Sequence, residues 1–93
     1  MTLSEDGKLS VEGSITVHNV VAVVERGIAL FDRDDLVIDL IHVTEVDSSA
    51  VSMLLEWQRE AHRCQRRICF ANTPSNLKGL AQLYGVSELL SLA

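Results

Sequence analysis

The sequence predicts a single α/β domain in which a mixed sheet of about four strands carries helices packed on it. Short runs of branched apolar residues, typical of buried strands, alternate with segments whose apolar residues recur every three or four positions. The 93 residues suffice for one domain and not two, so residues 1–93 are assigned to one unit. Hydrophobic residues make up 47% and charged residues 23%, which indicates a globular rather than a disordered chain.

The first third of the chain predicts a strand followed by a helix. The turn signal Asp6-Gly7 lies between short alternating segments and predicts a hairpin or a single edge strand near residues 8–12. From Thr16, a plausible N-cap, the apolar period becomes helical and predicts a helix over residues 16–31. The valines favour a strand, because β-branched residues lose rotamer freedom in a helix, but spacing and length favour the helix. Its predicted apolar face comprises Val17, Val20, Val24, Ile28 and Phe31.

The middle of the chain predicts a strand, a helix and a further strand. "LVIDLIHV", residues 36–43, has the composition of a buried central strand between polar turns. A helix is expected from Ser48 to about Arg63, and "RICFA", residues 67–71, is expected to form the next strand.

The last third predicts a capped helix. Thr73 is expected to be its cap and Pro74 to lie in its first turn. Gly85 marks the expected stop, and residues 86–92 are expected to form a short helix or turn. The predicted apolar face comprises Leu77, Leu80, Ala81 and Tyr84.

The second helix has an apolar arc wider than one contact with a sheet requires. Three residues should face the sheet: Val51, Leu54 and Leu55. Four more form an adjoining flank: Ala50, Met53, Trp57 and Cys64. The polar side comprises Ser48, Ser52, Glu56, Arg59 and Arg63. The flank either packs against a neighbouring helix or, through Met53 and Trp57, forms a docking surface, since both residue types are enriched at interfaces.

Composition excludes several functions. The net charge of −5, without a cluster of basic residues, disfavours binding to nucleic acids or anionic lipids. Cys64 and Cys69 do not have a metal or redox spacing and are expected to be reduced thiols in a cytosolic protein. No signal peptide is recognisable, and the apolar runs are far shorter than the ~18–20 residues that span a bilayer. Membrane association is therefore expected only through a partner.

Enzymatic motifs are also missing from the sequence. Ser48 and Ser49 lack a G-x-S-x-G context, and no glycine-rich phosphate loop is found. The histidines fall at an expected helix start, loop and helix end: His18, His42 and His62. The Asp-Ser-Ser at residues 47–49 is instead typical of a helix start, where Asp and Ser are favoured caps and a carboxylate suits the helix dipole.

The segment "LVIDLIHVTEVDSSAVSMLL", residues 36–55, resembles the core motif of STAS domains, which are named for sulfate transporters and anti-sigma factor antagonists. In that family a strand ending in Asp-Leu leads through a short loop to an Asp followed by small hydroxyl residues, which opens a helix. Glu12-Gly13 is similar to the pair that ends the family's first main strand, and the resemblance extends from about residue 8 to residue 90. One departure is Ala50, where the family usually has Gly.

The resemblance implies one of two branches. Anti-sigma factor antagonists are phosphorylated on the first hydroxyl after the motif's Asp, which is Ser48 here. The STAS subunit of Mla-type phospholipid ABC transporters sits on the cytoplasmic ATPase and ends in a helix similar to "LAQLYGVSELL", residues 80–90. Ala50 is bulkier than Gly and is expected to hinder close approach by a kinase or partner, which slightly disfavours the anti-sigma branch.

The function implied by the resemblance is that of a non-enzymatic cytoplasmic subunit, peripheral to the inner membrane, that binds and regulates or stabilises the transporter's ATPase. The alternative is an antagonist of a kinase-like anti-sigma factor, switched by phosphorylation at Ser48. Neither a cofactor nor a metal is expected. The residues expected to bind the partner are Ser14, Thr16, Asp47, Ser48, Ser49, Ser52, Met53, Glu56 and Trp57.

Overall fold

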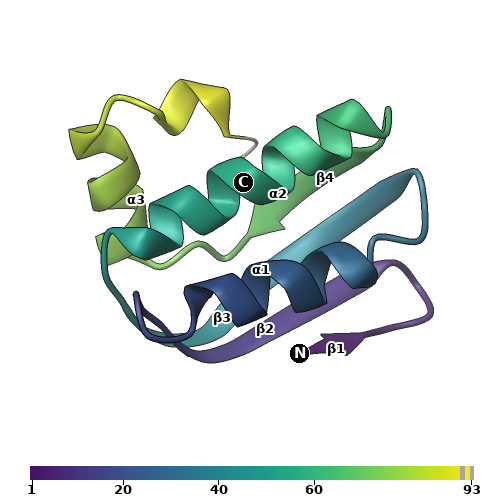
Figure 1. Ribbon diagram of the computed structural model, residues 1–93, viewed down its shortest axis with the longest axis horizontal. Coiled ribbons are helices and arrows are strands. Elements are labelled where there is room, and N and C mark those ends of the chain that lie inside the picture. The colour runs from purple at the N-terminus through teal and green to yellow at the C-terminus, as the bar shows by residue number, and fades with distance from the viewer. Residues whose placement is uncertain (91, 93) are drawn as a thin grey trace.

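The protein folds into one mixed sheet with helices packed on it, as the sequence predicted. The computed structural model describes residues 1–90 and residue 92 (Figure 1). Within them the elements are β1 (Thr2–Leu3), β2 (Lys8–Ile15), α1 (Val20–Ala29), β3 (Asp35–Val46), α2 (Ser49–Arg63), β4 (Arg67–Ala71), α3 (Ser75–Leu83) and a 3₁₀ turn, η1 (Ser87–Leu89).

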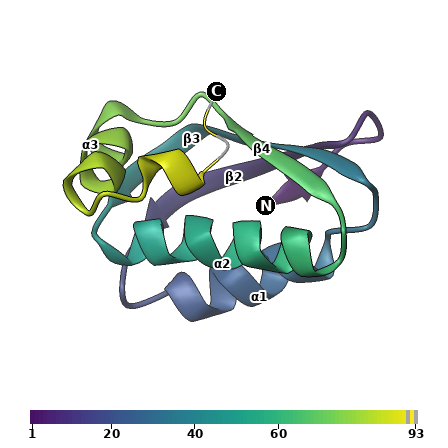
Figure 2. The same cartoon turned by 90° about the horizontal axis from the view of Figure 1, so that it is seen from above.

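The four strands lie in the order β1-β2-β3-β4. The pair β1–β2 is antiparallel, whereas β2–β3 and β3–β4 are parallel and are connected through α1 and α2. Figure 2 shows both of these helices on the same face of the sheet, while α3 lies at one end. Two successive crossovers of the same hand between neighbouring parallel strands produce this arrangement. The side chains of the core lie mainly between the sheet and α2.

That core has members from every strand except β1 and from all three α-helices. The strands and the segment after α1 contribute Leu9, Val11, Ile15, Phe31, Leu36, Ile38, Leu40, Val43, Ile68 and Phe70. The remaining apolar members are Ala50, Val51, Met53, Leu54, Trp57, Ala61, Leu77, Ala81 and Leu90, and α1 contributes the buried Gly27.

The predicted hairpin is present, and both central strands are longer than expected. Gly7 occupies the turn between β1 and β2 with φ of +87°, a conformation that glycine adopts without steric cost. The β2 and β3 strands stay paired as far as Ile15 and Val46, beyond the predicted ends at residues 12 and 43. His42 lies in β3, within the strand already predicted over residues 36–43, so its separate assignment to a loop was wrong.

The helix predicted over residues 16–31 begins later, at Val20, and ends at Ala29. Because Ile15 is still paired with β3, the chain turns before a helix can start. Thr16 is consequently not the N-cap, and the cap position belongs to Asn19. The predicted apolar face is also incomplete, since Val17 lies before the helix and is 67% exposed.

The helix α1 is held mainly through α2, by way of Trp57. The indole Nε1 of Trp57 donates a hydrogen bond to the backbone carbonyl of Val24, at 3.1 Å. Its ring meets that of Phe31 edge-on, with centroids 6.2 Å apart. Gly27, the buried residue of α1, lies directly against the indole. The flank of α2 therefore packs against a neighbouring helix.

The alternative interpretation of that flank was wrong. Met53 and Trp57 are both 0% exposed, because α1 covers the side of α2 that carries them. They cannot form a docking surface. Cys64 does not belong to the flank either, since it is the exposed C-cap residue of α2.

The start of α3 differs in detail from the prediction. The N-cap position is taken by Pro74, and helical residues begin at Ser75. Thr73 lies one residue before the cap, and its buried hydroxyl has no hydrogen-bond partner among the described residues. Its assignment as the cap was therefore wrong, because the chain after β4 reaches the helix one residue later than the pattern predicted.

The end of α3 confirms Gly85 as the stop. Gly85 has φ of +70°, and its N–H donates to the carbonyl of Gln82 at 3.0 Å. The N–H of Val86 donates to Ala81 at the same distance, which completes a Schellman motif. Tyr84 is the C-cap residue and is 55% exposed, so its predicted place on the buried face was wrong.

Replacement of Gly27 tests the contact between α1 and α2. A Cβ atom there would lie 2.4–2.7 Å from three atoms of the Trp57 indole, closer than such atoms can approach. We expect Gly27→Ala to lower the free energy of unfolding by about 1–3 kcal/mol, as measured by urea denaturation. Gly79→Ala in α3 is the control, since nothing lies within 4 Å of its Cβ position. The control should be neutral or more stable by up to about 1 kcal/mol, and equal effects at both positions would contradict tight packing at Gly27.

Candidate functional site

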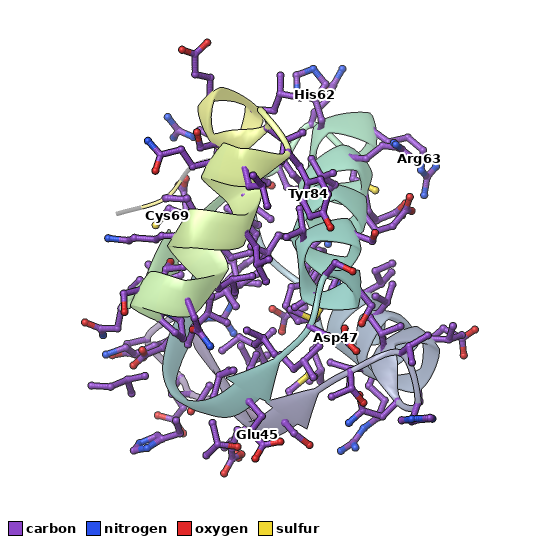
Figure 3. The ribbon with its side chains drawn as sticks, turned by 90° about the vertical axis from the view of Figure 1, so that its left-hand side faces the viewer. Glu45, Asp47, His62, Arg63, Cys69 and Tyr84 are labelled. Carbon is purple, nitrogen blue, oxygen red and sulfur yellow. The ribbon has the colours of Figure 1, made fainter. Side chains whose placement is uncertain are left out.

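The predicted Asp-Ser-Ser motif lies where α2 begins, beside the loop that follows β2. Because β2 and β3 are parallel neighbours paired at Ile15 and Val46, the segments after them leave the same edge of the sheet. Asp47 follows β3, and residues 16–19 follow β2. Figure 3 shows Asp47 at this end of the molecule. Ser14 and Thr16 are thus brought near the motif, as the sequence predicted.

Asp47 connects the two segments through its carboxylate. Its Oδ2 accepts a hydrogen bond from the backbone N–H of Val17 at 3.0 Å. Its Oδ1 accepts one from the N–H of Ser49 at 2.9 Å and another from the Ser49 hydroxyl. Asp47 therefore supplies the side-chain cap of α2 and also anchors the loop.

These hydrogen bonds stabilise the ionised form of Asp47. The hydroxyl of Ser49, followed by the N–H of Val17, lowers the pKa of the Asp47 carboxyl below its ordinary value of 3.8. A full negative charge is consequently present beside Ser48 at neutral pH. The charge also lies at the positive end of the α2 dipole, which favours it further.

Ser48 occupies the N-cap position of α2 without acting as a cap. Its backbone is helical, with φ of −62° and ψ of −21°, and its side chain makes no capping hydrogen bond. The residue is exposed, and its hydroxyl has no partner within residues 1–90 and 92. Ser48 therefore presents a free hydroxyl to any molecule that approaches this end of the helix.

Asn19 shapes the neighbouring loop, although sequence reasoning did not single it out. Its Oδ1 accepts a hydrogen bond from the N–H of Thr16 at 2.9 Å, and its Nδ2 donates one to the carbonyl of Ser14 at 2.8 Å. The Thr16 hydroxyl in turn accepts one from the N–H of His18 at 3.3 Å. Asn before a helix is a known turn former, and this signal was present in the sequence.

The remaining polar candidates continue along α2. Ser52 and Glu56 are both exposed, one and two turns beyond Ser48. Glu56 pairs with Arg59 at 2.6 Å, an exposed pair of the kind that contributes little to stability. Ser48, Ser52 and Glu56 recur every four residues and so form one stripe, hereafter the polar stripe.

An apolar groove borders the polar stripe on each side. One lies between α1 and α2 and has a volume of about 250 Å³; it is lined by Val20, Val21, Val24, Glu25, Ser52, Met53 and Glu56. The other lies towards the end of α3 and has about 260 Å³; it is lined by Ser48, Val51, Ser52, Leu55, Tyr84 and Val86. Figure 3 shows Tyr84 beside α2. The sequence did not predict these grooves, because the spacing of Tyr and Val residues along the chain does not show whether their side chains are covered.

Two features are missing from the described part of the chain, residues 1–90 and 92. No group of three or more His, Cys, Asp and Glu side chains there is arranged to hold a metal ion. None of the helices formed by these residues combines the length and apolar character needed to cross a bilayer.

Comparison with known proteins identifies the family. The family model described as "Mlab, STAS domain" matches residues 2–91. The chain belongs to the STAS domain family. No curated protein sequence matches this STAS domain.

Solved structures of other STAS domains have the same fold. The anti-sigma factor antagonist SpoIIAA in its unphosphorylated form is similar with a TM-score of 0.69 and 18% identity, over 92% of this chain and 77% of that one. The STAS domain of a SulP transporter from Vibrio cholerae is similar with a TM-score of 0.67 and 15% identity, over 98% and 75%. STAS domains are generally regulatory or interaction domains rather than enzymes, which agrees with a surface that offers grooves and hydroxyls.

Removal of the Asp47 carboxylate tests its role as cap and anchor. We expect Asp47→Ala to lower the melting temperature of the STAS domain by about 4–8 °C, as is usual when a cap is lost from a domain of this size. Amide exchange at Val17 and Ser49 should accelerate. Ser48→Ala is the matched control and should melt within about 2 °C of wild type, since the Ser48 side chain caps nothing. A larger drop in melting temperature for Ser48→Ala than for Asp47→Ala would show that Ser48, and not Asp47, is the cap.

Low pH should destabilise the domain by protonating carboxylates whose pKa is lowered in the folded state. A group whose pKa is lower in the folded state contributes stability above its unfolded pKa, and that stability is lost as pH falls through the folded value. The pKa of Asp47 is lowered by Ser49, and that of Asp39 by the Asn72 amide, then by the N–H of Ile41 and by Lys8. We expect the urea midpoint to be level from pH 7 to about 5 and to fall below about pH 4. Asp47→Asn should make that fall shallower, and an unchanged slope would show that Asp47 does not contribute.

Proposed function

We propose that this STAS domain is the subunit that binds and regulates or stabilises the ATPase of an Mla-type phospholipid ABC transporter at the inner membrane. It acts in the cytoplasm without catalysis and reaches the membrane only through its partner. The observation that carries the proposal is the match of the Mlab family model to residues 2–91. The resemblance of "LAQLYGVSELL", residues 80–90, to the tail of such subunits is in line with that match.

The conformation of that tail is consistent with a role in binding. Ala81 is buried and Leu80 is packed against the core, so they hold α3 in place. Tyr84 is 55% exposed and lines the groove that also contains Ser48. An exposed aromatic ring beside a groove is the kind of anchor that dominates protein interfaces. The tail therefore contributes both scaffold and contact surface.

The proposed contact surface consists of the exposed members of the original candidate set. Ser48 and Ser52 have small side chains, so the backbone of a partner can approach α2 closely and still find a hydroxyl to bind. The loop that contains residues 14–16 is joined to Asp47, next to Ser48, through the N–H of Val17, and Glu56 ends the surface with a negative charge. Met53 and Trp57 support this surface from beneath and do not touch the partner.

The alternative function is that of an anti-sigma factor antagonist switched at Ser48. The exposed, unpartnered hydroxyl of Ser48 favours it. A phosphate there would add about −1.5 to −2 charges, favoured by the helix dipole and opposed by Asp47. Ala50 does not argue against this function as the sequence suggested, because it is 0% exposed and its methyl group does not obstruct a kinase.

Co-expression distinguishes the two functions. The STAS domain should co-purify with a co-expressed ATPase subunit of an Mla-type transporter and should raise ATPase activity or the stability of the complex. Binding only to a kinase that regulates a sigma factor, with transfer of phosphate to Ser48, would establish the alternative instead.

Variants of Ser48 separate recognition from folding. Ser48→Arg and Ser48→Glu should keep a near-normal melting temperature, because the side chain points to solvent. In the complex they bring a clash and an unpaired charge, so we expect partner binding to weaken about 30-fold or more in a titration. Cys64→Arg and Cys64→Glu are matched controls with the same change of charge, at the exposed opposite end of α2. They should bind as wild type does, and normal binding by the Ser48 variants would place the contact elsewhere.

A further inference from the structure

The groove between α1 and α2 is the least polar of the grooves beside the polar stripe, and it is open to solvent. Val21, on the wall formed by α1, is 67% exposed, while Val20 and Val24 are half-buried beside it. Met53 lies beneath the groove and is 0% exposed. Aliphatic surface of this kind gains free energy when another apolar group covers it.

Acidic side chains stand on both walls of this groove. Glu25 comes from α1 and Glu56 from α2, and both are exposed. Glu56 pairs with Arg59, whereas Glu25 has no ion-pair partner in the described part of the chain. None of the residues that line the groove is Lys or Arg. A ligand that fits the groove should therefore be apolar at its centre and positively charged at its edges.

The volume of the groove favours a side chain of another protein over a separate small molecule. Its volume of about 250 Å³ lies below the range of roughly 300–1,000 Å³ typical of small-molecule pockets. Ser52 lines this groove as well as the one that contains Ser48, so a protein that covers the polar stripe also reaches this groove.

We propose that the α1–α2 groove receives an aliphatic side chain from the ATPase partner, carried on a segment in which Lys or Arg stands next to it. The aliphatic group packs on Val21 and Val24, and the basic group pairs with Glu25 or Glu56. This inference rests on the proposed function and specifies the chemistry of the surface that the STAS domain recognises. It adds α1, which sequence reasoning placed outside the site, to the contact.

Paired variants test the apolar and the charged part of the contact separately. Val21→Glu places a charge in the groove and should weaken binding to the ATPase at least about tenfold. Ile41→Glu is its control, with the same change of charge at a residue of β3 that is 57% exposed and lines neither groove. Glu25→Lys should weaken binding about three- to tenfold and reduce its dependence on salt between 50 and 500 mM. Glu5→Lys, also exposed and in the turn between β1 and β2, is the control for that change.

The outcomes separate this inference from the proposed function. If wild-type protein does not bind the ATPase at all, the proposed function fails, and with it the inference. If wild type binds and the groove variants match their controls, the function stands and the inference is overturned. Gel filtration with light scattering adds a further outcome: a wild-type dimer that Val21→Glu dissociates, with ATPase binding unchanged, would assign the groove to a second copy of this chain and overturn the inference. Melting temperatures of all four variants within about 3 °C of wild type exclude unfolding as the cause.

Discussion

The packing of the Trp57 indole against Gly27 is the contact on which the helical side of the domain depends. Gly27 is the buried residue of α1, whereas the apolar side chains of this helix, Val20, Val23, Val24 and Ile28, are only partly buried against the core. The indole compensates by filling the space beside Gly27 and by donating a hydrogen bond to the carbonyl of Val24. Without this contact, neither the position of α1 nor the groove beside it would be defined.

A second, polar connection operates at the other end of α1. Asp47 accepts hydrogen bonds from the N–H of Val17 and the N–H of Ser49 with its two carboxylate oxygens, so it connects the loop before α1 to the start of α2. Because Asp47 satisfies the helix end, the Ser48 hydroxyl is left without an internal role. A side chain that contributes little to folding is free to be used for recognition, which is why Ser48 variants separate binding from stability.

The two faces of the sheet differ in character. Among residues 1–90 and 92, no helix covers the face of the sheet opposite α1 and α2 (Figure 2). Ion pairs such as Lys8–Asp39 and Arg67–Asp35 connect neighbouring strands. On the helical side, by contrast, Val21, Tyr84 and their neighbours expose apolar surface next to free hydroxyls. A partner that removes apolar surface from water gains most on that side, which agrees with the contact surface proposed for the ATPase.

The sequence by itself determined the fold class, the order of the elements and the position of the motif. Periodicity alone was sufficient to predict β4 and the extent of α2, and Gly85 correctly predicted the end of α3. These features depend on local spacing and backbone conformation. The family motif likewise located the start of α2. Only the tertiary structure decided which side of each helix is covered. The sequence allowed Trp57 to be either a docking or a packing residue. The structure shows that it is a packing residue, because α1 lies over it. The start of α1 depended on how far β2 pairs with β3, and the grooves depended on how closely separate helices approach. These properties depend on contacts between segments that are distant in the chain, so no local sequence pattern predicts them.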